Sequence, residues 1–125
     1  MNDLAKAWAD ALRSGKYKQG TMGLRSGDAY CCLGVACELF RQTYGKGRWK
    51  ETANGDFYFS IGRERAGGFL PIRVRDALGL DDIGGRFDDG SLAALNDGGA
   101  TFAEIADIIE SEPPGLFVEK EASHE

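Results

Sequence analysis

The chain has 125 residues, the usual size of a single domain, so one hydrophobic core is expected. No apolar run approaches the roughly 20 residues that a membrane span needs, and the first residues lack the pattern of a signal peptide. The three cysteines, two of them adjacent, fit free thiols in a reducing compartment better than a secreted disulfide framework. We therefore expect a cytoplasmic protein.

The net charge is −5, but the two parts of the chain differ in sign. Residues 1–75 carry 13 Lys and Arg against 7 Asp and Glu, which gives +6, whereas residues 76–125 carry 2 against 13, which gives −11. This asymmetry indicates either an electropositive site opposite an acidic partner-binding face, or two halves that interleave in space and offset one another. The sequence leaves both interpretations open.

Helical spacing of apolar residues predicts four main helices. They cover residues 3–14, 29–44, 71–78 and 101–112. The second is expected to be the central core helix, with Cys32 in its apolar stripe, Asp28 as its N-cap and Gly45 as its terminating residue. The fourth opens with the capping-box pattern of Thr101 and Glu104.

Alternation of apolar and polar residues over Asp56–Ile61 predicts a half-buried strand, with Arg48–Lys50 as its hairpin partner and Asn54-Gly55 in the turn. A short helix is expected from Ser91 to Leu95, and residues 16–27 are expected to form a loop. The predicted fold is therefore α+β and mainly α, with a central helix packed by other helices and a small antiparallel element near residues 48–61. One domain over residues 1–114 and a mobile tail over residues 115–125 are expected.

Several short sequence motifs of this chain resemble those of a family of small uncharacterised proteins from tailed phages and bacterial prophages. The most specific is Tyr30-Cys31-Cys32-Leu33-Gly34-Val35, preceded by Trp8 and by residues 11–17. The match continues through Leu70-Pro71, Leu92 and residues 95–97 into residues 101–110. The resemblance implies a phage or prophage gene and a phage-type accessory protein, and it carries over no catalytic residue.

Catalysis by a thiol is disfavoured, because thiol enzymes usually pair cysteine with a histidine base. The single histidine, His124, is one residue from the end of the chain. Cys31, Cys32 and Cys37 match no usual zinc spacing and are read as packing residues. No catalytic residue, metal or cofactor is predicted.

The carboxylates of the second half define an expected acidic face. Its residues are Asp81, Asp82, Asp88, Asp89, Glu104, Asp107 and Glu110. Those between residues 81 and 89 also suit ordinary glycine-rich turns. The helix at 101–112 has no basic residue, so it is not expected to bind DNA, whose phosphates it would repel.

A second candidate surface combines cations with aromatic rings, a composition that suits a nucleotide or a single-stranded nucleic acid. It draws on the cations and rings of residues 16–65, among them Arg65 and Tyr58, and its candidate site residues are Lys16, Arg25, Arg48, Trp49 and Lys50. The leading hypothesis is a non-enzymatic protein that binds a host macromolecule through the acidic face, with inhibition of a host or defence protein as one form of this function. The alternatives are a nucleotide-binding protein that uses the basic surface and, third, a thiol-dependent enzyme.

Overall fold

The computed structural model describes residues 1–119, which form five helices and eight strands. The helices are α1 (Asp3–Arg13), α2 (Cys32–Tyr44), α3 (Ile72–Leu78), α4 (Leu92–Asp97) and α5 (Phe102–Ser111). The strands are β1 (Lys18–Gln19), β2 (Arg25–Ser26), β3 (Ala29–Tyr30), β4 (Arg48–Glu51), β5 (Asp56–Ile61), β6 (Glu64–Ala66), β7 (Arg86–Phe87) and β8 (Gly90–Ser91).

Six strands form one mixed sheet around β5, in the order β1-β3-β2-β5-β4. One edge of β5 pairs with β4, and the other edge pairs with β2 at its start and with β6 at its end. The β1–β3 pair is parallel and the other pairs are antiparallel. A separate hairpin is formed by β7 and β8.

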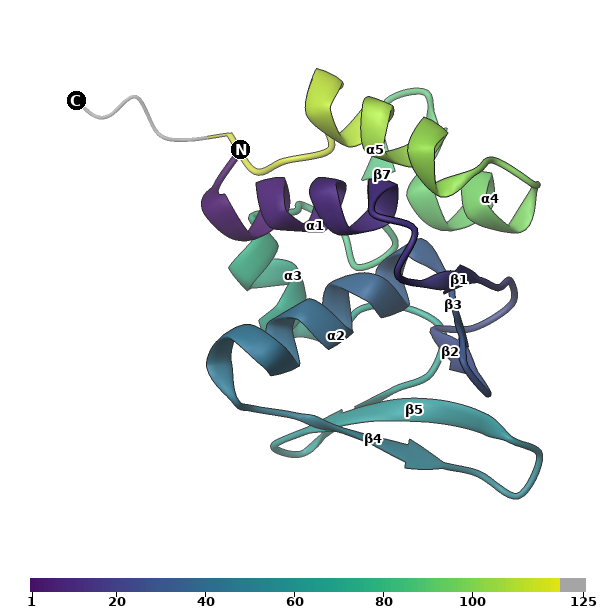
Figure 1. The fold of residues 1–125 in the computed structure, drawn as a ribbon. Helices are drawn as coiled ribbons and strands as arrows, with labels where there is room; N and C mark the ends of the chain where they lie inside the picture. The colour runs from purple at the N-terminus through teal and green to yellow at the C-terminus, as the bar shows by residue number, and fades with distance from the viewer. Residues whose placement is uncertain (120–125) are drawn as a thin grey trace.

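The elements are stacked in layers (Figure 1). The β4–β5 hairpin lies at the bottom of the view, α2 lies directly above it, and α1 and α3 follow, with α4 and α5 farthest from the hairpin. The core fills the space between these layers. Its largest fully buried side chains are Trp8, Phe59, Leu24, Leu33, Leu78, Leu80, Leu92, Ile105, Ile109, Leu116, Val35 and Val74. Within the described residues, no element covers the lower face of the hairpin.

The expected mainly α fold with a minor β element is wrong. Helices contain 39% of the described residues and strands contain 21%. The main sheet has six strands, so the fold is a mixed α/β fold. Five of the unpredicted strands are only two residues long. Alternation is not detectable over two residues, because these strands form through pairing with distant segments rather than through local propensity.

The helix predictions are confirmed in position, with one shifted start. The structure begins α2 at Cys32 with Cys31 as the N-cap, so the assignment of the cap to Asp28 is wrong. Ala29 and Tyr30 belong to β3 instead of the helix. Gly45 ends α2 in the left-handed region, with φ of 65°, as predicted. The Thr101–Glu104 capping box is also confirmed.

A fully buried amide side chain, Asn96 of α4, joins three parts of the fold. Its Oδ1 accepts hydrogen bonds from the Cys32 amide (3.1 Å) and from Gln19 Nε2 (3.0 Å). Its Nδ2 donates to the Gly20 carbonyl (2.8 Å). These partners satisfy the buried amide, so Asn96 has a structural role at the start of α2.

The segment that follows α5 returns to the fold. Leu116 is fully buried, and its carbonyl accepts a hydrogen bond from the Asp81 amide at 3.0 Å. Phe117 forms an antiparallel bridge with Leu80. The first part of the expected tail is thus packed on the domain, whereas residues 120–125, including His124, lie outside the described residues. No helix within residues 1–119 has the length and apolar character needed to cross a membrane.

Candidate functional site

Strand register brings three cations and two hydroxyl side chains onto one face of the β4–β5–β6 sheet. Arg48 pairs with Ser60, which pairs on its other side with Arg65, and Lys50 pairs with Tyr58. Since residues that are directly opposite in a sheet point to the same face, these five side chains form one surface. We call it the basic sheet face.

The opposite face of the same strands explains why this one is exposed. Phe59 and Ile61 alternate with Tyr58 and Ser60, and both are buried toward α2. Trp49 packs against Phe59 with its ring centroid 5.0 Å away. Apolar side chains therefore occupy the α2 side of the sheet, which leaves the intervening polar residues on the uncovered side.

No carboxylate within residues 1–119 forms an ion pair with the cations of the basic sheet face. Lys46 and Arg63 are also exposed. Lys46 lies in the loop before β4, and Arg63 lies in the turn between β5 and β6, so both are at the same end of the sheet as Arg48. Glu64, the acidic neighbour of Arg65, is engaged elsewhere, because its Oε2 accepts the Ile72 amide at the start of α3 (2.8 Å). The surface thus has a local excess of positive charge.

The structure separates the residues of the second candidate surface. Arg48 and Lys50 lie on the basic sheet face, but Arg25 and Trp49 lie on the α2 side of the sheet. The Arg25 guanidinium lies 4.0 Å from the centroid of the Phe57 ring and 5.5 Å from that of Trp49. Lys16 is in the loop between α1 and β1. Only two of the five predicted residues therefore lie on the basic sheet face.

Glu38 of α2 anchors the sheet, and it was not predicted from the sequence. It is 7% exposed, and its Oε1 accepts hydrogen bonds from Trp49 Nε1 (2.9 Å) and Arg41 Nε (3.0 Å). Its Oε2 accepts from Arg41 Nη2 (2.6 Å) and Gln42 Nε2 (2.7 Å). Burial raises the pKa of Glu38, but the hydrogen bonds outweigh it and hold the pKa below its ordinary value.

Replacing Glu38 by glutamine is expected to lower the free energy of unfolding near neutral pH by about 2 kcal/mol, because hydrogen bonds to a charged group are lost. The folded-state pKa lies below the unfolded value of about 4.3. The stabilisation is therefore present above that value and is lost as the pH falls through the folded-state pKa.

Urea unfolding of Glu38→Gln and of the wild type, near neutral pH and below about pH 3.5, measures this effect. The difference between the two proteins should shrink in acid. Exposed Glu51 of β4 supplies the control, since Glu51→Gln should change the free energy of unfolding by less than about 0.5 kcal/mol. An equal loss at both pH values for Glu38→Gln would contradict this role.

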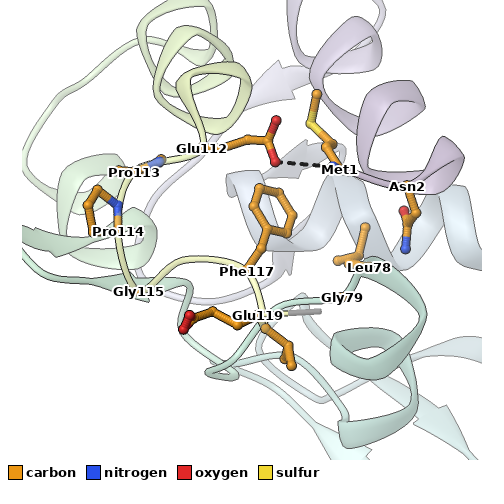
Figure 2. Close-up of a pocket in the computed structure, with 11 residues that line it drawn as sticks. Met1, Asn2, Leu78, Gly79, Glu112, Pro113, Pro114, Gly115, Phe117 and Glu119 are labelled. Carbon is orange, nitrogen blue, oxygen red and sulfur yellow. Dashed lines mark hydrogen bonds and ion pairs between the residues drawn. The ribbon is translucent and has the colours of Figure 1, made fainter. Parts of the chain in front are cut away.

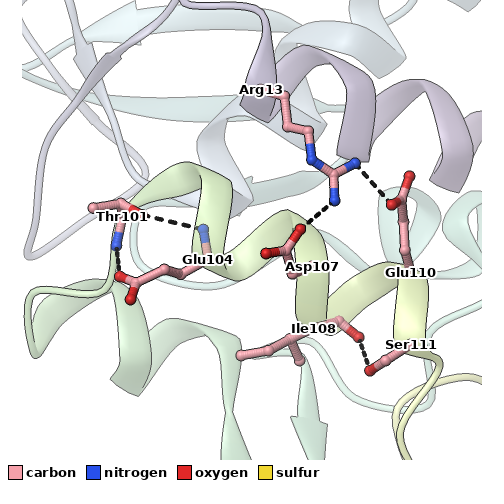
Figure 3. A network of polar contacts seen from close by, with 7 residues as sticks. All are labelled: Arg13, Thr101, Glu104, Asp107, Ile108, Glu110 and Ser111. Atoms are coloured by element: carbon pink, nitrogen blue, oxygen red, sulfur yellow. Dashed lines mark hydrogen bonds and ion pairs between the residues drawn. The ribbon is translucent and has the colours of Figure 1, made fainter.

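The acidic residues of α5 already have partners within the fold (Figure 3). The Arg13 guanidinium at the end of α1 contacts Asp107 Oδ1 at 2.5 Å and Glu110 Oε1 at 2.8 Å, and hydrogen bonding from it lowers the pKa of Glu110. The Glu104 carboxylate accepts the Thr101 amide at 2.8 Å. These partners reduce the charge that α5 presents to other molecules.

The other predicted acidic residues lie in turns around β7 and β8. Asp82 Oδ2 accepts the amides of Gly84 (2.8 Å) and Arg86 (3.3 Å), which is ordinary turn chemistry. Asp81, Asp88 and Asp89 are exposed and form no ion pair within residues 1–119. The predicted acidic face is therefore divided into an α5 part whose carboxylates have internal partners and a turn part in which only Asp82 has them.

All three thiols are buried, as predicted for Cys32. Burial raises the pKa of Cys31, Cys32 and Cys37, which keeps them protonated and poorly nucleophilic at neutral pH. Cys31 lines a cavity of 550 Å³ together with Met22 and Phe69. No histidine occurs in residues 1–119, so no thiol–histidine pair forms among them. The same residues contain no group of three side chains that could hold a metal ion.

Two further cavities open on the surface. One of 810 Å³ lies between the start of α1 and the segment after α5, with Leu78, Pro113 and Phe117 in its walls (Figure 2). It also adjoins Glu119, the last described residue. The other, of 510 Å³, is next to Tyr58 at the start of β5. Of these two cavities, only the one of 510 Å³ adjoins the basic sheet face, because Tyr58 belongs to both.

Comparison with known proteins places the chain in a family. The model of a family described as a domain of unknown function, DUF8296, matches residues 1–113, so the chain belongs to the DUF8296 family. The matched part includes all five helices and the entire six-stranded sheet. Neither a curated protein nor a solved structure matches the chain. The family description assigns no activity.

Proposed function

We propose that the protein binds single-stranded nucleic acid through the basic sheet face. The observation that carries the proposal is the placement of Arg48, Lys50 and Arg65 around Tyr58 on a sheet face that no element within residues 1–119 covers. Such cations attract phosphates, and release of the counterions condensed on the strand favours binding. The Tyr58 ring offers a base a surface on which to stack.

The shape of this surface favours a strand over a duplex or a free nucleotide. Stacking on Tyr58 requires a base that is not already stacked in a helix. A free nucleotide usually binds in a concave site with converging polar groups, whereas the cations here are spread along neighbouring strands. The nucleotide site predicted from the sequence keeps support only through Arg48 and Lys50.

The acidic turn residues support a second, weaker proposal. Asp81, Asp88 and Asp89 are exposed without ion pairs among the described residues, and they could contact a basic region of a host macromolecule, as a phage-type accessory protein would. Their region and the basic sheet face are on opposite sides of α2 (Figure 1). Both contacts are therefore compatible with one molecule.

Titration of a labelled single strand of about 12 nucleotides with the full chain, followed by fluorescence anisotropy, tests the leading proposal. A dissociation constant of about 1–100 µM is expected at physiological salt. Its logarithm should change with the logarithm of salt concentration with a slope of about 2 to 3.5, as three to five phosphate contacts require. A matching duplex and a mononucleotide should bind more weakly. Absence of binding at low salt, or binding indifferent to salt, would overturn the proposal.

A further inference from the structure

A cavity of 510 Å³ adjoins the basic sheet face at the start of β5. Tyr58 belongs to both, since its side chain lies on the basic sheet face and it also lines the cavity. Phe57, Asn54 and Asp56 contribute to the same walls, and Gly23 and Gly67 border them. The cavity therefore offers aromatic surface and a few polar groups at one end of the proposed strand-binding face, which is the usual make-up of a small-ligand site.

The carboxylate of Asp56 is the unexpected member of this wall. Asp56 is exposed, and its carboxylate has no ion pair or hydrogen bond within residues 1–119. The Asp56 backbone carbonyl accepts from the amide (2.8 Å) and the hydroxyl (3.0 Å) of Thr52. An ionised carboxylate can only accept hydrogen bonds. Arg25 also lines the cavity, but its Nε donates to the Gly27 carbonyl (2.9 Å) and its guanidinium lies 4.0 Å from the centroid of the Phe57 ring. The Asp56 carboxylate has no such partner, so it favours a part of the strand that presents donors.

Among the bases, guanine best meets this requirement. Its Watson–Crick edge carries two adjacent N–H donors, which match the two oxygens of a carboxylate. Splayed bases of single strands are commonly stacked on aromatic rings and hydrogen-bonded along that edge. We propose that the cavity accepts one splayed base of the bound strand and that Asp56 makes guanine the preferred base. This inference rests on the proposed function.

Glycine substitutions test whether the cavity is used. A Cβ added at Gly67 meets no atom within 4 Å, and the same is true at Gly68, which does not line this cavity. Neither glycine has the left-handed backbone that would oppose a side chain. Gly67→Phe should therefore fill the cavity mouth, and Gly68→Phe is the matched control.

The probes are three labelled strands of about 12 nucleotides, one all-pyrimidine, one with a single central guanine and one with a single central adenine. The wild type should bind the guanine strand about tenfold more tightly than the other two, as a bidentate base contact implies. Gly67→Phe and Asp56→Asn should each reduce that preference to less than about twofold. Gly68→Phe should keep it.

Circular dichroism establishes that each variant is folded, and Asp56→Asn keeps the test decisive if Gly67→Phe does not fold. Equal wild-type affinity for all three strands would overturn this inference but leave the proposed function standing. Equal preference for guanine and adenine would overturn the role of Asp56. Failure to bind any strand would overturn the proposed function itself.

Discussion

Replacing Gly34 by alanine is expected to lower the free energy of unfolding by about 3 kcal/mol, a large effect for the addition of one methyl group. Gly34 lies in the first turn of α2, where the helix packs directly on the backbone of Leu24. A Cβ there would collide with the Leu24 carbonyl oxygen and lie 2.8 Å from its carbonyl carbon. The same carbonyl accepts the Cys31 amide at 3.1 Å, so it cannot move freely.

The sign of this effect is informative, because replacing glycine by alanine inside a helix usually stabilises a protein by about 1 kcal/mol. Thermal unfolding should show a melting temperature lowered by about 10 °C for Gly34→Ala. Gly68→Ala adds the same methyl group where a Cβ meets no atom within 4 Å, and its melting temperature should be almost unchanged. A stabilised Gly34→Ala protein would show that the contact between α2 and Leu24 is not tight.

The Gly34 contact also accounts for the motif on which the family resemblance rests. Tyr30 lies in β3, Cys31 caps α2, and Cys32 and Leu33 are fully buried. Every one of these residues therefore has a packing role at the junction of the sheet and the central helix. The motif residues therefore contribute to the assembly of the fold.

The longer elements could be predicted from the sequence because their signals are local. The capping box and the apolar stripe specify α5, and alternation specifies β5. The two-residue strands could not be predicted, because β1 and β3 pair only once the chain between them has turned back. Their contribution to the sheet is a consequence of tertiary contacts.

The candidate site was only partly predictable, for a related reason. Grouping cations and rings by proximity in sequence put Trp49 with Arg48 and Lys50, although successive residues of a strand point to opposite faces. Applying that alternation would have separated them. Arg65 belongs to the basic and aromatic stretch of residues 16–65, but its place beside Ser60 depends on the β5–β6 pairing, which was not predicted. Glu38 left a weak signal, an isolated carboxylate within an apolar helix.

Reversing the three cations of the basic sheet face is expected to weaken binding of a single strand by more than about 100-fold, because nonspecific affinity comes almost entirely from contacts with phosphates. The variant carries Arg48→Glu, Lys50→Glu and Arg65→Glu. All three residues are exposed, so the fold should persist. The matched control carries Lys6→Glu, Lys16→Glu and Arg86→Glu, which are exposed outside this face and change the net charge equally.

Anisotropy titrations of the wild type and these two variants, at the same salt concentration, test most directly whether this surface is the binding site. Charges beyond about 10 Å are largely screened at 0.1 M salt, so the control should lose less than about threefold in affinity. The account predicts near-complete loss of binding for the sheet-face variant alone. Equal losses for both variants, or full binding by the sheet-face variant, would contradict it.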